Sequence, residues 1–236
     1  MKIYALMTKG AGKVICQDSV LVGNNILSEG YLEYTPAEGE NVVVAVADGV
    51  GGNKAGEVAS FMAVYGLRNA KLFQGTTVES ARKVINNANK NILSLASSDP
   101  EKMGNMATTL TGIVLGSNQQ IVFHVGNTRL CKKNGIYLMP LTEAHEGLDG
   151  RLNACLGIKP ELLNSLEVTD MTEDIAGTQD LVLTTDGIHD HISDVQMDGI
   201  LKNGGTIKEI LWAIEATARA NGSQDDISII WVSRSE

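Results

Sequence analysis

Two apolar runs in the chain end in the same dipeptide, and this feature most constrains how the chain can fold. Residues 42–47 read VVVAVA and lead into Asp48-Gly49, and residues 181–185 read LVLTT and lead into Asp186-Gly187. Runs of this kind predict buried strands. Because a carboxylate at the rim of a buried strand is costly unless it is paired or coordinates a cation, both aspartates are candidate metal ligands.

Two further acidic positions lie beside expected strands. Asp18 begins an early strand, and Asp225 precedes the last one together with Asp226. Carboxylates and a glycine carbonyl, without Cys or paired His, are hard oxygen ligands that select Mg²⁺ or Mn²⁺ over zinc or copper. A single Asp-Gly pair is most often a plain turn. Four separate acidic positions at strand ends instead suggest one shared metal site.

Helical periodicity occurs in pairs of segments between runs of strands. A helix is expected after Gly56, with an apolar face that contains Val58, Phe61, Met62, Tyr65 and Leu67. Further helices are expected over residues 77–95, 195–202 and 207–220. Because the helices come in pairs rather than alternating with single strands, the pattern predicts an α+β sandwich and disfavours a doubly wound parallel sheet.

Strand-like segments are separated by short turn signals. They cover residues 20–27, 41–47, 108–115, 119–125, 129–133, 136–139, 166–171, 180–185 and 227–232. The four strands between residues 108 and 139 are expected to form one antiparallel meander. Residues 28–41 are expected to form the tip of a hairpin.

Charge and composition exclude several classes of protein. The 236 residues carry 19 Lys plus Arg and 28 Asp plus Glu, a net charge of −9, which excludes nucleic-acid binding by phosphate neutralisation. The hydrophobic fraction of 43% is typical of a folded protein, and one domain over residues 1–236 is expected. No run approaches the ~20 apolar residues of a membrane span. The three cysteines are odd in number and far apart in the sequence, which is typical of a reducing compartment. A cytoplasmic protein without a membrane partner is therefore expected.

The glycine-rich segment at residues 48–56 lies where a dinucleotide-binding turn would lie. It does not fit that template, because the third glycine would fall on Lys54. The P-loop pattern fails at Gly12-Lys13, which is followed by Val14 instead of Ser or Thr. Nucleotide binding is therefore disfavoured.

At several ordered points the chain matches a family pattern. The matches are a RxxNxD(S/A)-like segment at 13–19, DGxGG…GExAS at 48–60, TTL at 108–110, a GDSR-like turn at 126–129, LTxDH at 141–145, a strand ending in LG at 154–157, SDGL at 185–188 and DNxT at 225–228. In these segments the chain resembles the metal-dependent serine/threonine protein phosphatases of type 2C, the PPM family, and more closely their small bacterial members.

The resemblance implies a fold and a chemistry. The fold would be a four-layer α-β-β-α sandwich, two antiparallel sheets flanked by helix pairs, with two Mg²⁺ or Mn²⁺ ions per subunit at one end. Asp48 would bridge the ions, the Gly49 carbonyl would bind one of them, and Asp186 and Asp225 would complete the other. Asp18 would act directly or through ligand waters. A water activated by the metals would attack phosphoserine or phosphothreonine on proteins without a phosphoenzyme.

The chain departs from the family at three residues near the expected site. Lys13 replaces the arginine that contacts the phosphate, and so keeps the charge without the bidentate geometry. Asn127 replaces an aspartate that supports a third, weaker metal, which puts that third site in doubt. Asp226 replaces an asparagine. In addition, the flap segment at about residues 145–156 is expected to be much shortened.

Two functional classes remain open at this point. The first is an active phosphatase whose partners are phosphorylated proteins, namely a serine/threonine kinase and its targets. The second is a weakened pseudophosphatase that binds a phosphoprotein as a regulatory module. The presence of Asp18, Asp48, Asp186 and Asp225 favours catalysis. His189, which follows one of these residues, is expected to be a solvated loop residue and no metal ligand.

Overall fold

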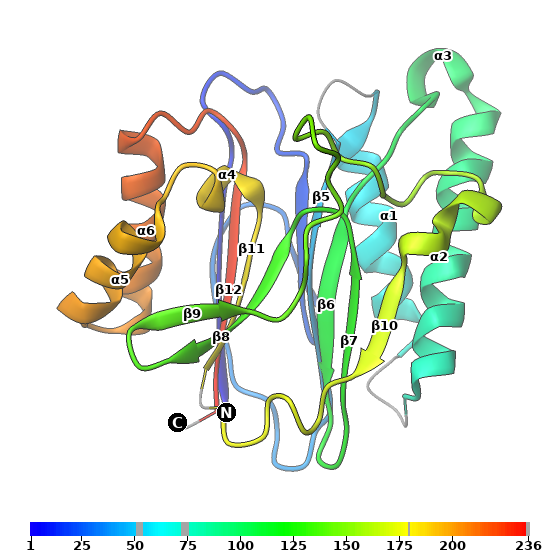
Figure 1. Cartoon of the computed structure of the whole chain (residues 1–236). Helices are drawn as coiled ribbons and strands as arrows, with labels where there is room; N and C mark the ends of the chain where they lie inside the picture. The colour runs from blue at the N-terminus through cyan, green and yellow to red at the C-terminus, as the bar shows by residue number, and fades with distance from the viewer. Residues whose placement is uncertain (51–53, 72–75, 179, 235–236) are drawn as a thin grey trace.

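The structure is a computed structural model that describes residues 1–50, 54–71, 76–178 and 180–234. Two six-stranded antiparallel sheets pack face to face, and helices cover the outer face of each sheet. The expected α-β-β-α sandwich is confirmed. Figure 1 shows these layers side by side, with both chain termini at the end of the sandwich opposite α4 (Asp186–His189).

The first sheet contains strands from both ends of the chain. Its spatial order is β4 (Gly30–Tyr34), β1 (Lys2–Thr8), β12 (Ile227–Ser233), β11 (Asp180–Thr184), β8 (Arg129–Asn134) and β9 (Tyr137–Pro140). The second sheet has the order β10 (Glu167–Asp170), β7 (Gln120–Val125), β6 (Leu110–Leu115), β5 (Val42–Asp48), β2 (Asp18–Val22) and β3 (Asn25–Leu27). Because both faces of the sheets are covered, β2 and β5 are buried along their length without the alternation of a sheet that has one solvent-exposed face.

Two pairs of helices form the outer layers. α1 (Gly56–Asn69) and α2 (Val78–Ser98) pack on the second sheet, and α5 (Asp194–Asn203) and α6 (Ile207–Ala220) pack on the first. The short helices α3 (Pro100–Met103) and η1 (Pro160–Ser165) lie in connections. A third apolar cluster fills the space between the two sheets.

Local sequence signals set the starts of three helices. α2, α5 and α6 each begin with a capping box, in which the N-cap hydroxyl accepts a backbone N–H and the third helical side chain reaches back; the N-caps are Thr77, Ser193 and Thr206. These helices therefore begin within a residue or two of the predicted positions. Of the helices in the described ranges, none combines the length and apolar character needed to span a membrane.

The predicted meander over residues 108–139 is wrong. β6 pairs with β7 in the second sheet, whereas β8 pairs with β9 in the first. The chain crosses between the sheets after Gly126, whose φ of 116° is accessible to glycine and whose position leaves no room for a Cβ beside Thr109. A turn signal in the sequence does not reveal whether the next strand stays in the same sheet.

The predicted strand over residues 20–27 is divided into two strands, and the predicted hairpin tip at 28–41 is wrong. Gly23, with a φ of 59°, forms a tight turn that folds β2 back onto β3. Residues 30–34 then form β4, which pairs with β1 in the opposite sheet. The sequence reading had assigned no strand to β1 itself.

The predicted apolar face of α1 is only partly correct. Leu67 is fully buried, and Val58 and Met62 pack against the core. Phe61 and Tyr65 are 47% and 43% exposed, and their rings stack on each other on the outer side of the helix. The core face is formed instead by small residues, Ala59, Ser60 and Ala63 with Val64.

Candidate metal centre

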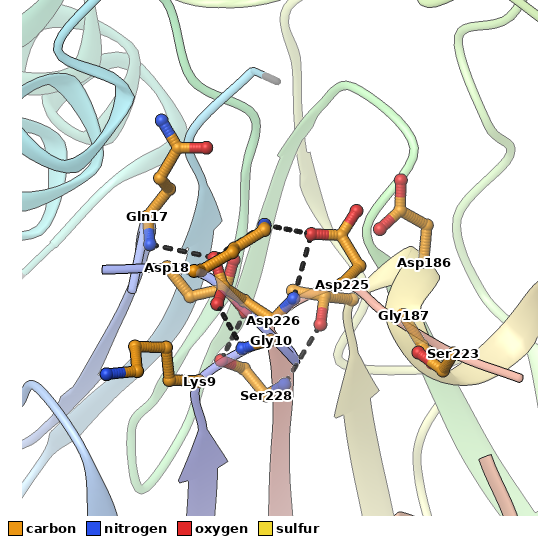
Figure 2. A network of polar contacts seen from close by, with 12 residues as sticks. Lys9, Gly10, Gln17, Asp18, Asp186, Gly187, Ser223, Asp225, Asp226 and Ser228 are labelled. Atoms are coloured by element: carbon orange, nitrogen blue, oxygen red, sulfur yellow. Dashed lines mark hydrogen bonds and ion pairs between the residues drawn. The ribbon is translucent and has the colours of Figure 1, made fainter. Parts of the chain in front are cut away.

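The predicted acidic residues converge at the end of the sandwich that carries α4. Asp18 is the first residue of β2 and Asp48 the last of β5, and the two lie directly opposite each other in that strand pair. Asp186 opens α4 directly after β11, and Asp225 lies just before β12. The site therefore combines two adjacent strands of one sheet with two adjacent strands of the other. Figure 2 shows Asp18, Asp186 and Asp225 around this junction.

Asp18 and Asp186 each keep one carboxylate oxygen without a partner among the described residues. Ser228 Oγ donates a hydrogen bond of 2.6 Å to Asp18 Oδ2, and Asn127 Nδ2 donates one of 3.1 Å to Asp186 Oδ2. Within the described part of the chain, the buried atoms Asp18 Oδ1 and Asp186 Oδ1 have no hydrogen-bond partner. Buried polar atoms normally find a partner, so these two oxygens indicate a ligand.

The crowding of carboxylates changes their acidity. Burial raises the pKa of Asp18 to about 7, and the negative charges of Asp226, Asp186 and Asp225 act in the same direction. Burial also raises the pKa of Asp48 well above its ordinary value, with Asp18, Asp186 and Asp225 as the neighbouring charges. Such a group of carboxylates must either hold protons or be neutralised by cations.

The glycine after each aspartate allows a close backbone approach. A Cβ on Gly49 would lie 2.5 Å from the backbone of Gly56, and a Cβ on Gly187 would lie 2.1 Å from the carbonyl oxygen of Asp226. Neither glycine has a positive φ. These glycines are therefore required by the close packing at the strand ends and not by their backbone conformation.

The backbone of Asp48 is held on both sides. Its N–H donates to Thr109 Oγ1 at 3.0 Å, and its carbonyl oxygen accepts from Thr108 Oγ1 and from the Thr109 N–H, both at 2.8 Å. The TTL motif thus fixes the aspartate that the family pattern makes the bridging ligand. Gly51 and Gly52 of the DGxGG motif, which begins at Asp48, lie outside the described residues.

Asp226 differs from its neighbour Asp225. Asp226 is 2% exposed, and its Oδ1 accepts from the Gly10 N–H at 2.7 Å. Its Oδ2 accepts from the Gln17 N–H at 2.8 Å and from Lys13 Nζ at 2.9 Å. We call this set of contacts the Asp226 clasp; it ties both ends of the loop at residues 10–17 to the last strand (Figure 2).

Lys13 lies at the rim of the site and pairs with both acids. Its ammonium contacts Asp225 Oδ1 as well as Asp226 Oδ2. Burial acts to lower the pKa of Lys13, but the hydrogen bonds and charges of the two aspartates outweigh it and raise the pKa above its ordinary value. The group is therefore a fixed positive charge beside the carboxylates. Lys13 and Asp226, which both depart from the family pattern, thus contact each other in the structure.

Asn127 bridges two carboxylates through its amide. Nδ2 donates to Glu146 Oε1 at 3.0 Å as well as to Asp186 Oδ2. Glu146 belongs to the segment in which the flap was expected to be short, where it bridges to Leu152 and Gly147 N donates to Arg151 O at 2.8 Å. An aspartate at position 127 would face both carboxylates without a donor.

Sequence reasoning identifies neither Ser228 nor Arg219 as a contributor, and it misplaces one histidine. Ser228 orients Asp18, and Arg219 Nη1 donates to the Asp225 carbonyl at 2.6 Å. Asp226 is recognisable in the sequence as part of an Asp-Asp pair, but its contact with the 10–17 loop is visible only in the structure. His189, expected to be solvated, ends α4, is half-buried and contacts Thr184 Oγ1 at 3.2 Å, and burial lowers its pKa to about 3.

The oxygen atoms of this site can be compared with the ligands that a divalent cation requires. Among the described residues, no three His, Cys, Asp or Glu side chains already form a group that could hold a metal ion. The Asp225 side chain is 48% exposed and is paired with Lys13, so its carboxylate has room to rotate. Carboxylate oxygens without Cys or His ligands, two of them buried and unpartnered, fit Mg²⁺ or Mn²⁺.

Comparisons with known proteins agree with the fold and the motifs. The family model described as Protein phosphatase 2C matches residues 15–222. A serine/threonine phosphatase stp from Listeria monocytogenes is 29% identical over 213 residues, covering 81% of this chain and 84% of that protein. The protein phosphatase PhpP from Streptococcus pneumoniae is 25% identical over 230 residues, covering 89% and 92%.

Solved structures show the same fold at lower identity. The serine/threonine phosphatase Stp1 from Staphylococcus aureus aligns with a TM-score of 0.79 at 18% identity, over 98% of this chain and 94% of that chain. The catalytic domain of the serine/threonine protein phosphatase PstP, in complex with two manganese ions, aligns with a TM-score of 0.70 at 21% identity, over 99% of both chains.

Proposed function

Because the chain belongs to the protein phosphatase 2C family, we propose that it hydrolyses phosphoserine and phosphothreonine on proteins in a reaction that requires divalent metal ions. One observation carries this proposal beyond the family relationship. Asp18 and Asp186 each present a buried oxygen that no described residue satisfies, in a cluster where burial and, after it, neighbouring negative charges raise the pKa of Asp18 and Asp48.

The side chains divide the work of holding two cations. Asp48, at the end of β5 opposite Asp18, would contact both ions. Asp186 and Asp225 would hold one of them, and the Gly49 carbonyl would hold the other. When bound, the ions supply positive charge for the phosphate and lower the pKa of a water nucleophile. Their charge also explains how a protein with a net charge of −9 can bind a phosphate dianion.

Other residues position these ligands and the substrate. Ser228 donates to Asp18 Oδ2, which leaves Oδ1 directed to the site. Lys13 offers its ammonium to a phosphate oxygen as a point charge, where an arginine would offer a planar pair of donors. We expect the segment at about residues 145–156 to be a much shortened flap, which would leave the site open to the substrate.

The cellular setting is also part of the proposal. We expect phosphoproteins as substrates and a serine/threonine kinase as the opposing enzyme, with Mn²⁺ or Mg²⁺ as the cofactor. The three cysteines at positions 16, 131 and 155 form no disulfide in the described residues, which supports a reducing compartment such as the cytoplasm. The pseudophosphatase alternative gains no support from a particular contact.

The direct test measures hydrolysis of p-nitrophenyl phosphate and of a phosphothreonine peptide with Mn²⁺, with Mg²⁺ and with chelator. We expect turnover only with a divalent ion, and a loss on the order of 100-fold in kcat/KM for Asp186→Ala. The matched control is Asp174→Ala, an exposed carboxylate outside the site, which should leave kcat/KM unchanged. Turnover that survives the chelator, or an Asp186→Ala variant with normal activity, would contradict the metal-dependent mechanism. Metal binding without turnover would favour the pseudophosphatase.

A further inference from the structure

A cleft of about 380 Å³ lies beside the metal centre and shares Asp18 with it. We call it the flanking cleft. Its lining residues are Lys9, Val14, Ile15, Cys16, Asp18, Ser19, Ser28, Glu29, Glu57 and Phe61. Because Asp18 belongs to both, a peptide whose phosphorylated residue reaches the metal centre passes the mouth of this cleft within a few residues, at ~3.5 Å per residue.

The walls of the flanking cleft expose large apolar side chains. Val14 is 94% exposed, Ile15 is 55% exposed and Phe61 is 47% exposed. Single exposed apolar residues are common, but three of them around one concave site next to an active centre indicate a binding surface.

The exposed apolar residues lie on supported segments. Val14 and Ile15 lie in the loop at residues 10–17, whose two ends are fixed by the Asp226 clasp through Gly10 and Gln17. Phe61 lies on α1 and stacks on Tyr65, with 5.5 Å between the ring centroids. A surface that is already ordered loses little conformational entropy when a peptide binds, so contacts here translate into affinity.

The charges around the flanking cleft favour a cationic neighbour. Glu29 and Glu57 line it, and Lys9 is the one basic side chain among the lining residues. Lys9 Nζ is directed toward the Val14 carbonyl at 3.4 Å. The acidic side chains therefore attract a Lys or Arg of the peptide and disfavour an acidic or a second phosphorylated residue.

We propose that the flanking cleft selects protein substrates in which an apolar residue and a basic residue lie next to the phosphorylated Ser or Thr. The apolar side chain packs between Val14, Ile15 and Phe61, and the basic side chain pairs with Glu29 or Glu57. This inference rests on the proposed phosphatase function. It concerns which phosphoproteins are hydrolysed, a question that the metal ligands leave open.

The test compares two phosphothreonine peptides of equal length and p-nitrophenyl phosphate, all with Mn²⁺. One peptide carries Leu and Arg on both sides of the phosphothreonine, and the other carries Asp at the same positions. We expect kcat/KM for the Leu/Arg peptide to exceed that for the Asp peptide by about tenfold or more, mainly through KM. Fluorescence anisotropy with labelled copies of both peptides gives their affinities independently of turnover.

Variants assign the preference to the flanking cleft. Combining Val14→Ser with Ile15→Ser should lower the ratio of kcat/KM for the Leu/Arg peptide to that for p-nitrophenyl phosphate by about tenfold. Combining Glu29→Gln with Glu57→Gln should reduce the preference over the Asp peptide by roughly threefold. The matched control is Val195→Ser on α5, a position 80% exposed and outside the cleft, which should leave both ratios unchanged.

The outcomes separate this inference from the proposed function. Equal kcat/KM and equal affinity for the two peptides would overturn the inference while leaving the phosphatase function intact. A Val14→Ser/Ile15→Ser variant that loses both substrates equally would also overturn it, because the loop would then serve catalysis and not selection. No turnover of any of the three substrates with Mn²⁺ would contradict the proposed function, and the anisotropy titration would still decide whether the cleft discriminates between the peptides.

Discussion

Two sets of buried carboxylates lie at the same end of the sandwich, and they differ in what satisfies them. Asp226 receives two backbone N–H groups and the Lys13 ammonium. Asp18 and Asp186 each receive one donor and keep a second oxygen that is buried and unpartnered within the described residues. Burial therefore does not separate a structural carboxylate from a ligand, whereas the count of donors does.

The two sets also differ in the charges that lie next to each carboxylate. The Asp226 clasp brings a cation of the chain's own, the Lys13 ammonium, to within 2.9 Å of its carboxylate. The carboxylates of Asp18 and Asp48 face other carboxylates, and their pKa values are raised by burial and by those neighbours. Removing a negative charge should thus have opposite effects on stability in the two sets.

The largest effect is expected for Asp48→Asn. The substitution removes the proposed bridging ligand, so kcat/KM with Mn²⁺ should fall on the order of 100-fold or more. In chelator the melting temperature should rise or stay constant, because one of several mutually repelling carboxylates is gone. Activity assays and thermal unfolding of the same preparation test both expectations, with Asp174→Asn as the control. A lower melting temperature of Asp48→Asn in chelator would contradict this expectation. It would mean that the Asp48 carboxylate stabilises the fold, as the Asp226 carboxylate does.

Asp226→Asn should act in the opposite direction on stability. An amide cannot accept from Gly10, Gln17 and Lys13 together, so a buried donor is left without a partner, and the free energy of unfolding should fall by about 3 kcal/mol. Urea unfolding in chelator measures this change. The matched control is Asp225→Asn, whose side chain is 48% exposed and which should cost about 1 kcal/mol or less. Equal losses for the two variants would refute the distinction.

The pH dependence of stability offers a third way to separate the two sets. The pKa of Asp18 is about 7 in the folded chain, above its value of ~3.9 in an unfolded chain. The stabilisation from protonated Asp18 is therefore fully present below about pH 4 and is lost as the pH rises through about 7. In chelator, the difference in melting temperature between Asp18→Asn and the parent chain should grow over this window. With Mn²⁺, this difference in melting temperature should no longer increase with pH. An equal increase with and without metal would contradict the prediction.

The smallest effect is expected at position 127. Asn127 donates to both Glu146 and Asp186, so Asn127→Asp places a third carboxylate between them and should lower stability in chelator by about 1 kcal/mol. We propose that the same change strengthens a third, weak metal site, which would shift the Mn²⁺ concentration needed for half-maximal activity by up to roughly tenfold. An unchanged Mn²⁺ dependence would mean that this position does not influence metal binding.

The same contrast explains how much could be predicted from the sequence. Asp48 and Asp186 were recognisable because each ends an apolar run, and the starts of α2 and α6 were recognisable because capping is a local property. The clasp was not recognisable, since Asp226 meets Gly10 only through a contact between residues 216 positions apart.

The errors in the fold have a similar origin. Whether β8 follows β7 in the same sheet depends on pairing partners far away in the chain, and strand propensity contains no information about them. The periodic pattern also does not reveal the exposure of Phe61, because small residues that a hydrophobic period overlooks, Ala59, Ser60 and Ala63, form the buried side of α1. Phe61, which the sequence pattern places on the apolar face of α1, instead lines the flanking cleft.

The most direct test of the account is the stoichiometry of Mn²⁺ binding to the purified chain, measured by isothermal titration calorimetry. The account predicts two ions per chain in the parent protein, a loss of binding in Asp48→Asn, and unchanged stoichiometry in Asp174→Asn. Fewer than two ions in the parent chain, or full binding in Asp48→Asn, would contradict the claim that the unpartnered carboxylates at the strand ends form a centre for two metal ions.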